Sequence, residues 1–156
     1  MSFDKAKAYL EEKGFADRVL QFSVSSATVA LAAEAVGCEP AHIAKSLTFM
    51  VDGSAVMIIC AGDHKIDNSK FKSCFRCKAT MLSPEEVSSL IGHEIGGVCP
   101  FGIKAGVSVY LDESLKAYET VYPACGDAAS AVRLTPDELF TLAGAREWID
   151  VCKPIG

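Results

Sequence analysis

The sequence lacks the long hydrophobic run that a membrane-spanning helix needs. Half of its 156 residues are hydrophobic, yet no stretch approaches the roughly 18 uninterrupted apolar residues of a spanning helix. The first ten residues carry Asp4, Lys5 and Lys7, where a signal peptide would be apolar. We therefore expect a cytosolic protein that makes no contact with a membrane.

An excess of positive charge is also missing. The chain has 15 lysines and arginines against 20 aspartates and glutamates, which gives a formal net charge of -5. Proteins that coat nucleic acids bind phosphates through a cationic surface. DNA is therefore not expected as a partner, whereas a local contact with one RNA end remains compatible with this charge.

Several familiar catalytic and cofactor-binding motifs are absent as well. The sequence contains no Gly-x-Gly-x-x-Gly, no P-loop, no Gly-x-Ser-x-Gly and no His-Glu-x-x-His. Its 7 cysteines are an odd number, and several lie in apolar runs, as reduced and buried cysteines do. We expect no disulfide framework, no cofactor and no metal.

Cys74 and Cys77 form the one closely spaced cysteine pair. A zinc site needs four ligands, and no second Cys-x-x-Cys is present. A redox dithiol is the other interpretation, because Lys72 and Arg76 are placed to lower a thiol pKa. Incidental cysteines are the simpler hypothesis, and the three histidines, His42, His64 and His93, are expected to be packing or surface residues.

What the chain does contain predicts one domain over residues 1–156 with a mixed α/β fold. Turn and capping signals punctuate its hydrophobic pattern: Asp52-Gly53 predicts a hairpin turn, and two capping boxes with proline predict helix starts. Helices are expected over 2–13, from Ser26 or Thr28 to Ala35, 83–92 and 135–144, and strands over 18–24, 46–51, 55–61, 107–111, 120–122, 131–134 and 148–151. The mixture predicts a curved, barrel-like mixed sheet flanked by helices.

Lys45 is the first candidate for a functional residue, because it places a cation at the start of an otherwise apolar strand. Such a lysine is most often a solvated strand terminus. The alternative is an ammonium held over a concave sheet, where it could polarise a carbonyl or balance developing negative charge.

A glycine-rich segment, residues 96–102, is the second candidate. It concentrates three glycines and a proline in seven residues. One interpretation is a tight connection between a helix and a strand. The other is a loop whose missing β-carbons allow its backbone N–H groups to approach a ligand as an oxyanion hole.

Several landmarks recur in a fixed order from about residue 18 to residue 151: Thr28-Val29-x-x-Ala32-Ala33 before Gly37, Lys45-Ser46-Leu47, Gly62-Asp63, Gly96-Gly97-Val98-x-Pro100-x-Gly102, and Gly126 before Arg133-Leu134-x-Pro136-x-Glu138-Leu139. In this order the chain resembles the YbaK/prolyl-tRNA synthetase-associated editing family, which hydrolyses mischarged aminoacyl-tRNA. The resemblance covers nearly the whole chain.

The resemblance implies a role for each matching residue. Lys45 would bind the ester carbonyl, and the backbone amides of Gly97, Val98 and Cys99 would receive the oxyanion. Water, the substrate's own side chain or its terminal ribose hydroxyl would attack, so no protein nucleophile is required. The implied substrate-binding residues are Thr28, Ser46, Gly96, Pro100, Gly102, Gly126, Ser130 and Ala131.

The resemblance also implies a partner, the acceptor end of an aminoacylated tRNA, and admits an aminoacyl-tRNA synthetase as a second. The one local cationic stretch suited to tRNA phosphates comprises Lys65, Lys70, Lys72, Arg76 and Lys78, although it is equally a solvated helix face. Ala131 stands where relatives that act on cysteinyl-tRNA have an aspartate, which argues against cysteine specificity. The hypothesis of a different class is a binding module that holds an aminoacylated end or a small ligand without hydrolysing it.

Overall fold

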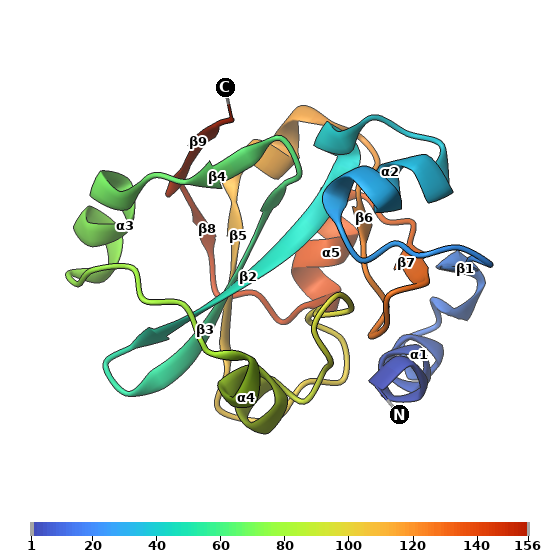
Figure 1. Ribbon diagram of the computed structural model, residues 1–156, viewed down its shortest axis with the longest axis horizontal. Helices are drawn as coiled ribbons and strands as arrows, with labels where there is room; N and C mark the ends of the chain where they lie inside the picture. Colours follow the sequence, from blue (N-terminus) through green and yellow to red (C-terminus); the bar gives the residue numbers. More distant parts are fainter. Residues whose placement is uncertain (1, 156) are drawn as a thin grey trace.

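In a computed structural model that describes residues 2–155, a five-stranded mixed sheet occupies the centre of the protein (Figure 1). The strand order is β6-β2-β3-β5-β8, with only the β2–β3 pair antiparallel. The strands are β2 (Ile43–Val51), β3 (Ser54–Ala61), β5 (Ser108–Asp112), β6 (Tyr122–Pro123) and β8 (Trp148–Ile149). The mixed α/β class predicted from the sequence is confirmed.

The hairpin of β2 and β3 is the longest pairing in the sheet, running from Ala44 opposite Ala61 to Val51 opposite Ser54. Asp52 and Gly53 have φ angles of 50° and 76°, the left-handed values that a tight two-residue turn requires. The predicted turn is therefore confirmed. The strand itself begins three residues before Ser46, so Lys45 lies inside β2.

The helices begin where their capping residues predict. The side chain of Thr28, not Ser26, caps α2, and Ser83 and Thr135 each form a complete capping box with a glutamate three residues later. The α-helices are α1 (Ser2–Glu12), α2 (Val29–Val36), α3 (Asn68–Phe75), α4 (Pro84–Glu86) and α5 (Pro136–Leu142). Shorter helical turns span Ala16–Arg18, Pro40–His42, Glu113–Ala117 and, in π form after α4, Val87–Ile91.

Two small antiparallel sheets flank the central one. β1 (Val19–Gln21) pairs with β7 (Ser130–Val132), and β4 (His64–Ile66) pairs with β9 (Cys152–Pro154). The strand expected over 18–24 is shorter than predicted, because β7 offers it only three partners. The β4–β9 pair was not predicted.

Alternation along the strands divides the core between the two faces of the central sheet. Met57 and Ile59 of β3 pack with residues of α1 and α5 on one face, whereas Ile58 packs with Phe71 of α3 on the other. None of the helices formed by residues 2–155 is long and apolar enough to cross a membrane.

Candidate active site

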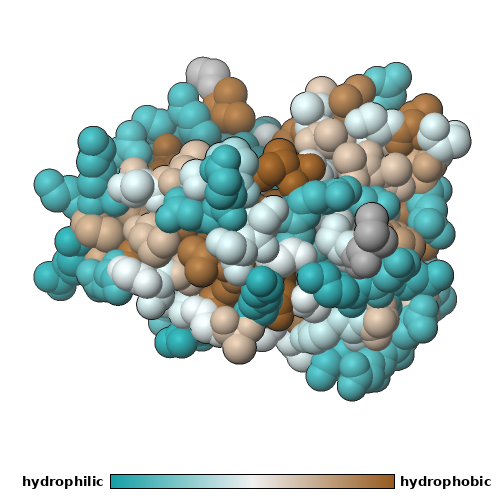
Figure 2. Space-filling model, turned by 60° about the horizontal axis from the view of Figure 1, so that its bottom comes forward, coloured by the Kyte–Doolittle hydropathy of each residue, from teal (hydrophilic) through white to brown (hydrophobic). Residues whose placement is uncertain are grey.

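A cavity of about 260 Å³ opens beside the outer edge of β2. Its wall consists largely of small side chains, including five alanines at positions 27, 32, 44, 124 and 131. At its rim, Met81 and Ile95 are 60% and 62% exposed. Hydrophobic side chains also emerge among hydrophilic ones on the face shown in Figure 2. The interior of the cavity is thus lined mainly by small side chains, and its rim is partly apolar.

Seven residues predicted from the sequence line this cavity, and five do not. Those that line it are Thr28, Lys45, Ser46, Gly96, Val98, Ser130 and Ala131. Gly97, Cys99, Pro100, Gly102 and Gly126 lie outside its wall. The structure therefore brings the strand and the glycine segment to one cavity, but only part of that segment faces it.

Successive residues of β2 point to opposite faces of the sheet, and this separates Lys45 from Ser46. Lys45 pairs with Cys60, whose side chain lies on the α3 face. Ser46 pairs with Ile59, whose side chain lies on the opposite face with Val98. Because directly paired residues share a face, Ser46 rather than Lys45 points toward the glycine segment.

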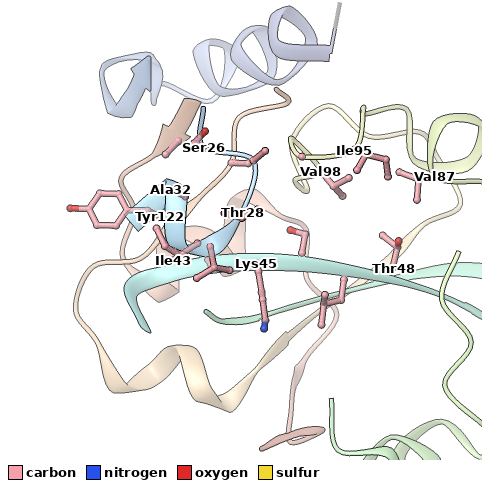
Figure 3. Close-up of a pocket in the computed structure, with 18 of the residues that line it drawn as sticks. Ser26, Thr28, Ala32, Ile43, Lys45, Thr48, Val87, Ile95, Val98 and Tyr122 are labelled. Carbon is pink, nitrogen blue, oxygen red and sulfur yellow. The ribbon is translucent and has the colours of Figure 1, made fainter. Parts of the chain in front are cut away.

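Figure 3 shows the same arrangement in side chains. The Lys45 amine extends below the β2 ribbon, whereas Thr48, Val98 and Ile95 lie above it. Strand alternation therefore turns the Lys45 side chain away from the glycine segment. Lys45 lines the cavity from the strand edge, and among the described lining residues it alone carries a charged side chain. Its ammonium makes no ion pair within residues 2–155.

Two residues of the glycine segment, Gly96 and Val98, line the cavity. The Gly97 N–H donates to the Glu94 carbonyl at 3.1 Å, which corrects its assignment as an oxyanion donor because that hydrogen is already bonded. No hydrogen-bond acceptor for the Val98 N–H is found in the described part of the chain. The Gly96 N–H likewise has no acceptor among the described residues, so the amides of Gly96 and Val98 both remain available to a ligand.

Three of the predicted glycines serve close backbone packing. A β-carbon on Gly97 would overlap the backbone of Asp127, and one on Gly102 or Gly126 would overlap the backbone of α1. These contacts fit the tight-connection interpretation. They also correct the placement of Gly102 and Gly126 at the substrate, because each faces the first helix.

Some hydroxyl groups around the cavity have hydrogen-bond partners within the protein, and others do not. The Ser26 Oγ accepts from the Ser130 N–H at 3.1 Å, and the Ser130 Oγ donates to Asp127 at 2.7 Å. Thr28 accepts from the Leu31 N–H. By contrast, the buried Ser46 Oγ has no partner among the described residues. Buried polar atoms are normally hydrogen-bonded, so the Ser46 Oγ is an exception among the buried hydroxyl groups of the described residues.

Cys99 and His93 lie near the cavity but inside the core. The Cys99 Sγ is 3.5 Å from the His93 Nε2, which lies 2.7 Å from the Phe101 carbonyl oxygen. Burial raises the pKa of the Cys99 thiol and lowers the pKa of His93. A protonated thiol and a neutral imidazole without solvent access make a packing pair rather than a nucleophile and its base.

Comparison with known proteins identifies the family to which the chain belongs. The profile described as the aminoacyl-tRNA editing domain matches residues 24–142, well over half of the chain. The chain is a member of this editing-domain family. That result confirms the family predicted from the sequence.

Individual relatives agree with this assignment of the editing domain. YwhH, an uncharacterized protein of Bacillus subtilis (strain 168), is 49% identical over 154 residues, which are 98% of each chain. The proline--tRNA ligase of Lysinibacillus sphaericus (strain C3-41) is 29% identical over 115 residues, covering 72% of this chain and 20% of the ligase. A crystal structure of a proposed trans-editing enzyme for prolyl-tRNA synthetase matches with a TM-score of 0.88 at 35% identity, covering 97% of both chains.

The basic stretch of the editing domain lies outside the cavity wall, on β4, α3 and the segment that follows. Lys65, Lys72, Arg76 and Lys78 are exposed. Lys70 is different, because its Nζ lies 2.9 Å from the Asp150 carboxylate and donates to the Cys152 carbonyl. This engagement removes Lys70 from the set of free cations and leaves four for a phosphate chain.

The Cys74–Cys77 pair lies at the end of α3, where Arg76 ends the helix with a φ angle of 63°. Burial, with a smaller contribution from Glu147, raises the pKa of Cys74, whereas a redox-active cysteine needs a lowered one. Among residues 2–155, no group of three or more His, Cys, Asp or Glu is placed to hold a metal ion. Both observations favour incidental cysteines.

We expect the double variant Cys74→Ser, Cys77→Ser to keep the activity and the melting temperature of the natural chain, because neither thiol reaches the cavity. A strong chelator should likewise leave turnover unchanged. The measurement is deacylation before and after chelation, together with metal content of the purified protein. Stoichiometric zinc, or loss of activity in either arm, would contradict this prediction.

Other cavity residues had not been predicted from the sequence. Met81, Ile95 and Val87 come from the segments around α4, and Thr48 comes from β2. Thr48 carried one detectable signal, a polar side chain two residues from Ser46 and hence on the same face. Met81 and Ile95 carried none, because their position depends on how distant segments fold against β2.

Proposed function

We propose that the protein is a trans-editing deacylase, which hydrolyses the ester of a small non-cognate amino acid on mischarged tRNA. Membership of the editing-domain family supports the reaction class. The observation that carries the proposal is the cavity itself, whose wall is built largely of small side chains and includes Ser46, with one charged residue, Lys45, at the strand edge. Such a site suits a small polar ester.

In this proposal the protein supplies position and electrostatic help rather than a nucleophile. The Val98 N–H supports the oxyanion from the glycine segment, and Lys45 supplies positive charge at the strand edge where the terminal nucleotide arrives. An aminoacyl ester is already activated, so aligned water or a substrate hydroxyl is a sufficient nucleophile. The buried Cys99–His93 pair has no part in the reaction.

The proposed substrate is alanyl- or seryl-tRNA, with cysteinyl and threonyl esters as further candidates. Ala131 and Ala124 line the wall without charge, so the cavity selects by size and not by an ionic contact. The proline tRNA is the proposed carrier, because relatives include proline--tRNA ligases and a proposed trans-editing enzyme for prolyl-tRNA synthetase. The exposed cations Lys65, Lys72 and Arg76 are proposed to meet its phosphates.

The test compares deacylation of alanyl-, seryl-, cysteinyl- and prolyl-tRNA at matched concentrations. We expect the alanyl and seryl esters to be cleaved at least about tenfold faster than the prolyl ester, since one methylene in a pocket is worth about 1–3 kcal/mol. Equal cleavage of prolyl-tRNA would contradict size selection. Binding of all four esters without cleavage would establish the binding-module alternative.

A further inference from the structure

The outer edge of β2 is covered by other segments on both sides of Ser46 but not at Ser46 itself. Toward its start, the edge is covered by β6, whose pairing ends with Ala44 opposite Pro123. Toward its end, the segment at Met81 covers it, with the Met50 N–H donating to Thr80 and the Leu82 N–H donating to Thr48. Between these two covers the edge faces the cavity.

The bonds of the second cover show which peptide groups point outward. The Met50 N–H and the Thr48 carbonyl both point away from β3. Peptide groups along a strand alternate in direction with a period of two residues, and the register with β3 is unbroken from Ala44 to Val51. The N–H and the C=O of Ser46 therefore also point outward, into the uncovered gap.

Ser46 thus presents an unused N–H donor and an unused C=O acceptor at the same place. No backbone hydrogen bond to its N–H or C=O on this edge is found within residues 2–155, and its buried Oγ is unpartnered. Unbonded backbone groups in a strand are a ready template for one more residue of extended chain. The next residues of β2 whose main-chain groups point outward are Ala44 and Thr48. Ala44 pairs with β6, and the Thr48 carbonyl accepts from the Leu82 N–H, so the gap has room for one such residue.

An aminoacyl ester carries the matching groups. Its α-amino N–H is a donor and its ester C=O is an acceptor, separated by one α-carbon as in a residue of a strand. A directly opposed antiparallel pair exchanges both bonds between two residues and places their side chains on the same face. Opposite Ser46, that face is the one with Val98, where the alanine-rich wall lies.

We propose that the amino acid of the substrate docks on Ser46 as a one-residue β-bridge: its amino group donates to the Ser46 C=O and its ester C=O accepts from the Ser46 N–H. This inference rests on the proposed function. It makes Ser46 a residue that binds the substrate directly through its main chain. It also places the substrate side chain beside the Ser46 Oγ and in the small-walled part of the cavity.

Two measurements test the two hydrogen bonds of the bridge, one accepted by the Ser46 C=O and one donated by the Ser46 N–H. Each deacylation rate is expressed relative to the spontaneous hydrolysis rate of the same ester. For the acceptor half, propionyl-tRNA, which lacks the amino group, is compared with alanyl-tRNA on the natural chain. For the donor half, the Ser46 amide is replaced by a backbone ester, which removes the N–H without adding atoms. We expect each change to lower deacylation by about tenfold, the effect of one lost hydrogen bond of ordinary strength.

Matched controls separate this idea from its rivals. The backbone ester at Ser46 should lower the melting temperature no more than the same replacement at Thr48, because both N–H groups lie outside the β2–β3 ladder and each ester weakens only one ladder carbonyl, that of the preceding residue. A backbone ester at Thr48, whose N–H also points outward, should have little effect on cleavage. Undiminished cleavage in either half of the test, or a larger loss at Thr48 than at Ser46, would overturn the bridge. Failure of the natural chain to cleave alanyl-tRNA would instead refute the proposed function.

Discussion

Replacing Lys45 with methionine is expected to reduce deacylation about a hundredfold while leaving the fold intact. Lys45 is the only charged side chain of the described cavity wall, and its ammonium has no ion-pair partner within residues 2–155. Methionine preserves most of the apolar stem that packs on the α3 face, so the change removes charge rather than volume. Single-turnover deacylation of alanyl-tRNA measures the loss.

A matched control for this variant is Lys13→Met, which removes an exposed lysine just beyond α1 and far along the chain from the cavity wall. It should leave turnover unchanged. Saturating tRNA should not restore the Lys45→Met rate if the charge acts on the reacting end. It should restore the rate if the charge acts only on binding of the terminal nucleotide, on the side of β2 to which the Lys45 amine extends (Figure 3). Normal turnover of folded Lys45→Met would remove Lys45 from the mechanism.

The second large effect is expected at Gly97, and it is an effect on stability. A β-carbon there would overlap the Asp127 and Gly126 backbone, which cannot move aside as a flexible side chain could. We expect Gly97→Ala to lower the free energy of unfolding by about 3 kcal/mol, the upper end of the usual cost of overpacking. In a chain of this size that corresponds to roughly 10 °C in melting temperature.

The control for Gly97 is Gly14→Ala. Gly14 has a φ angle of +84°, and a β-carbon there would meet no atom within 4 Å. Its substitution therefore measures the cost of a left-handed backbone alone, about 1 kcal/mol. A Gly97→Ala variant as stable as the natural chain would contradict the close packing described here. If its activity alone fell, the oxyanion role first expected for Gly97 would be restored.

The contrast between these glycines shows which features a sequence can predict. The Asp52-Gly53 turn and the capping boxes at Ser83 and Thr135 depend on interactions within a few residues, so their local patterns were sufficient. Gly97 owes its role to Asp127, which lies 30 residues along the chain by their numbers. A glycine that permits a turn and one that permits a distant backbone to approach have the same local pattern.

Lys45 illustrates a second limit. The sequence indicates that Lys45 and Ser46 point to opposite faces of a strand, because alternation is a local property. Which face carries the glycine segment depends on how residues 92–106 return to the sheet, and no local signal records that path. Both predicted residues of β2, Lys45 and Ser46, therefore line the cavity, but only Ser46 lies on the face of the glycine segment. The rim residues Met81 and Ile95 were missed for the same reason.

The interrupted edge of β2 also affects how the protein behaves toward other copies of itself. A long uncovered strand invites sheet extension by neighbouring molecules, which is a common route to aggregation. Here β6 and the segment at Met81 shield the strand on both sides of Ser46, so the remaining opening is too short to nucleate intermolecular pairing. The same two covers that would admit a single amino acid thus deny this strand edge to a whole polypeptide.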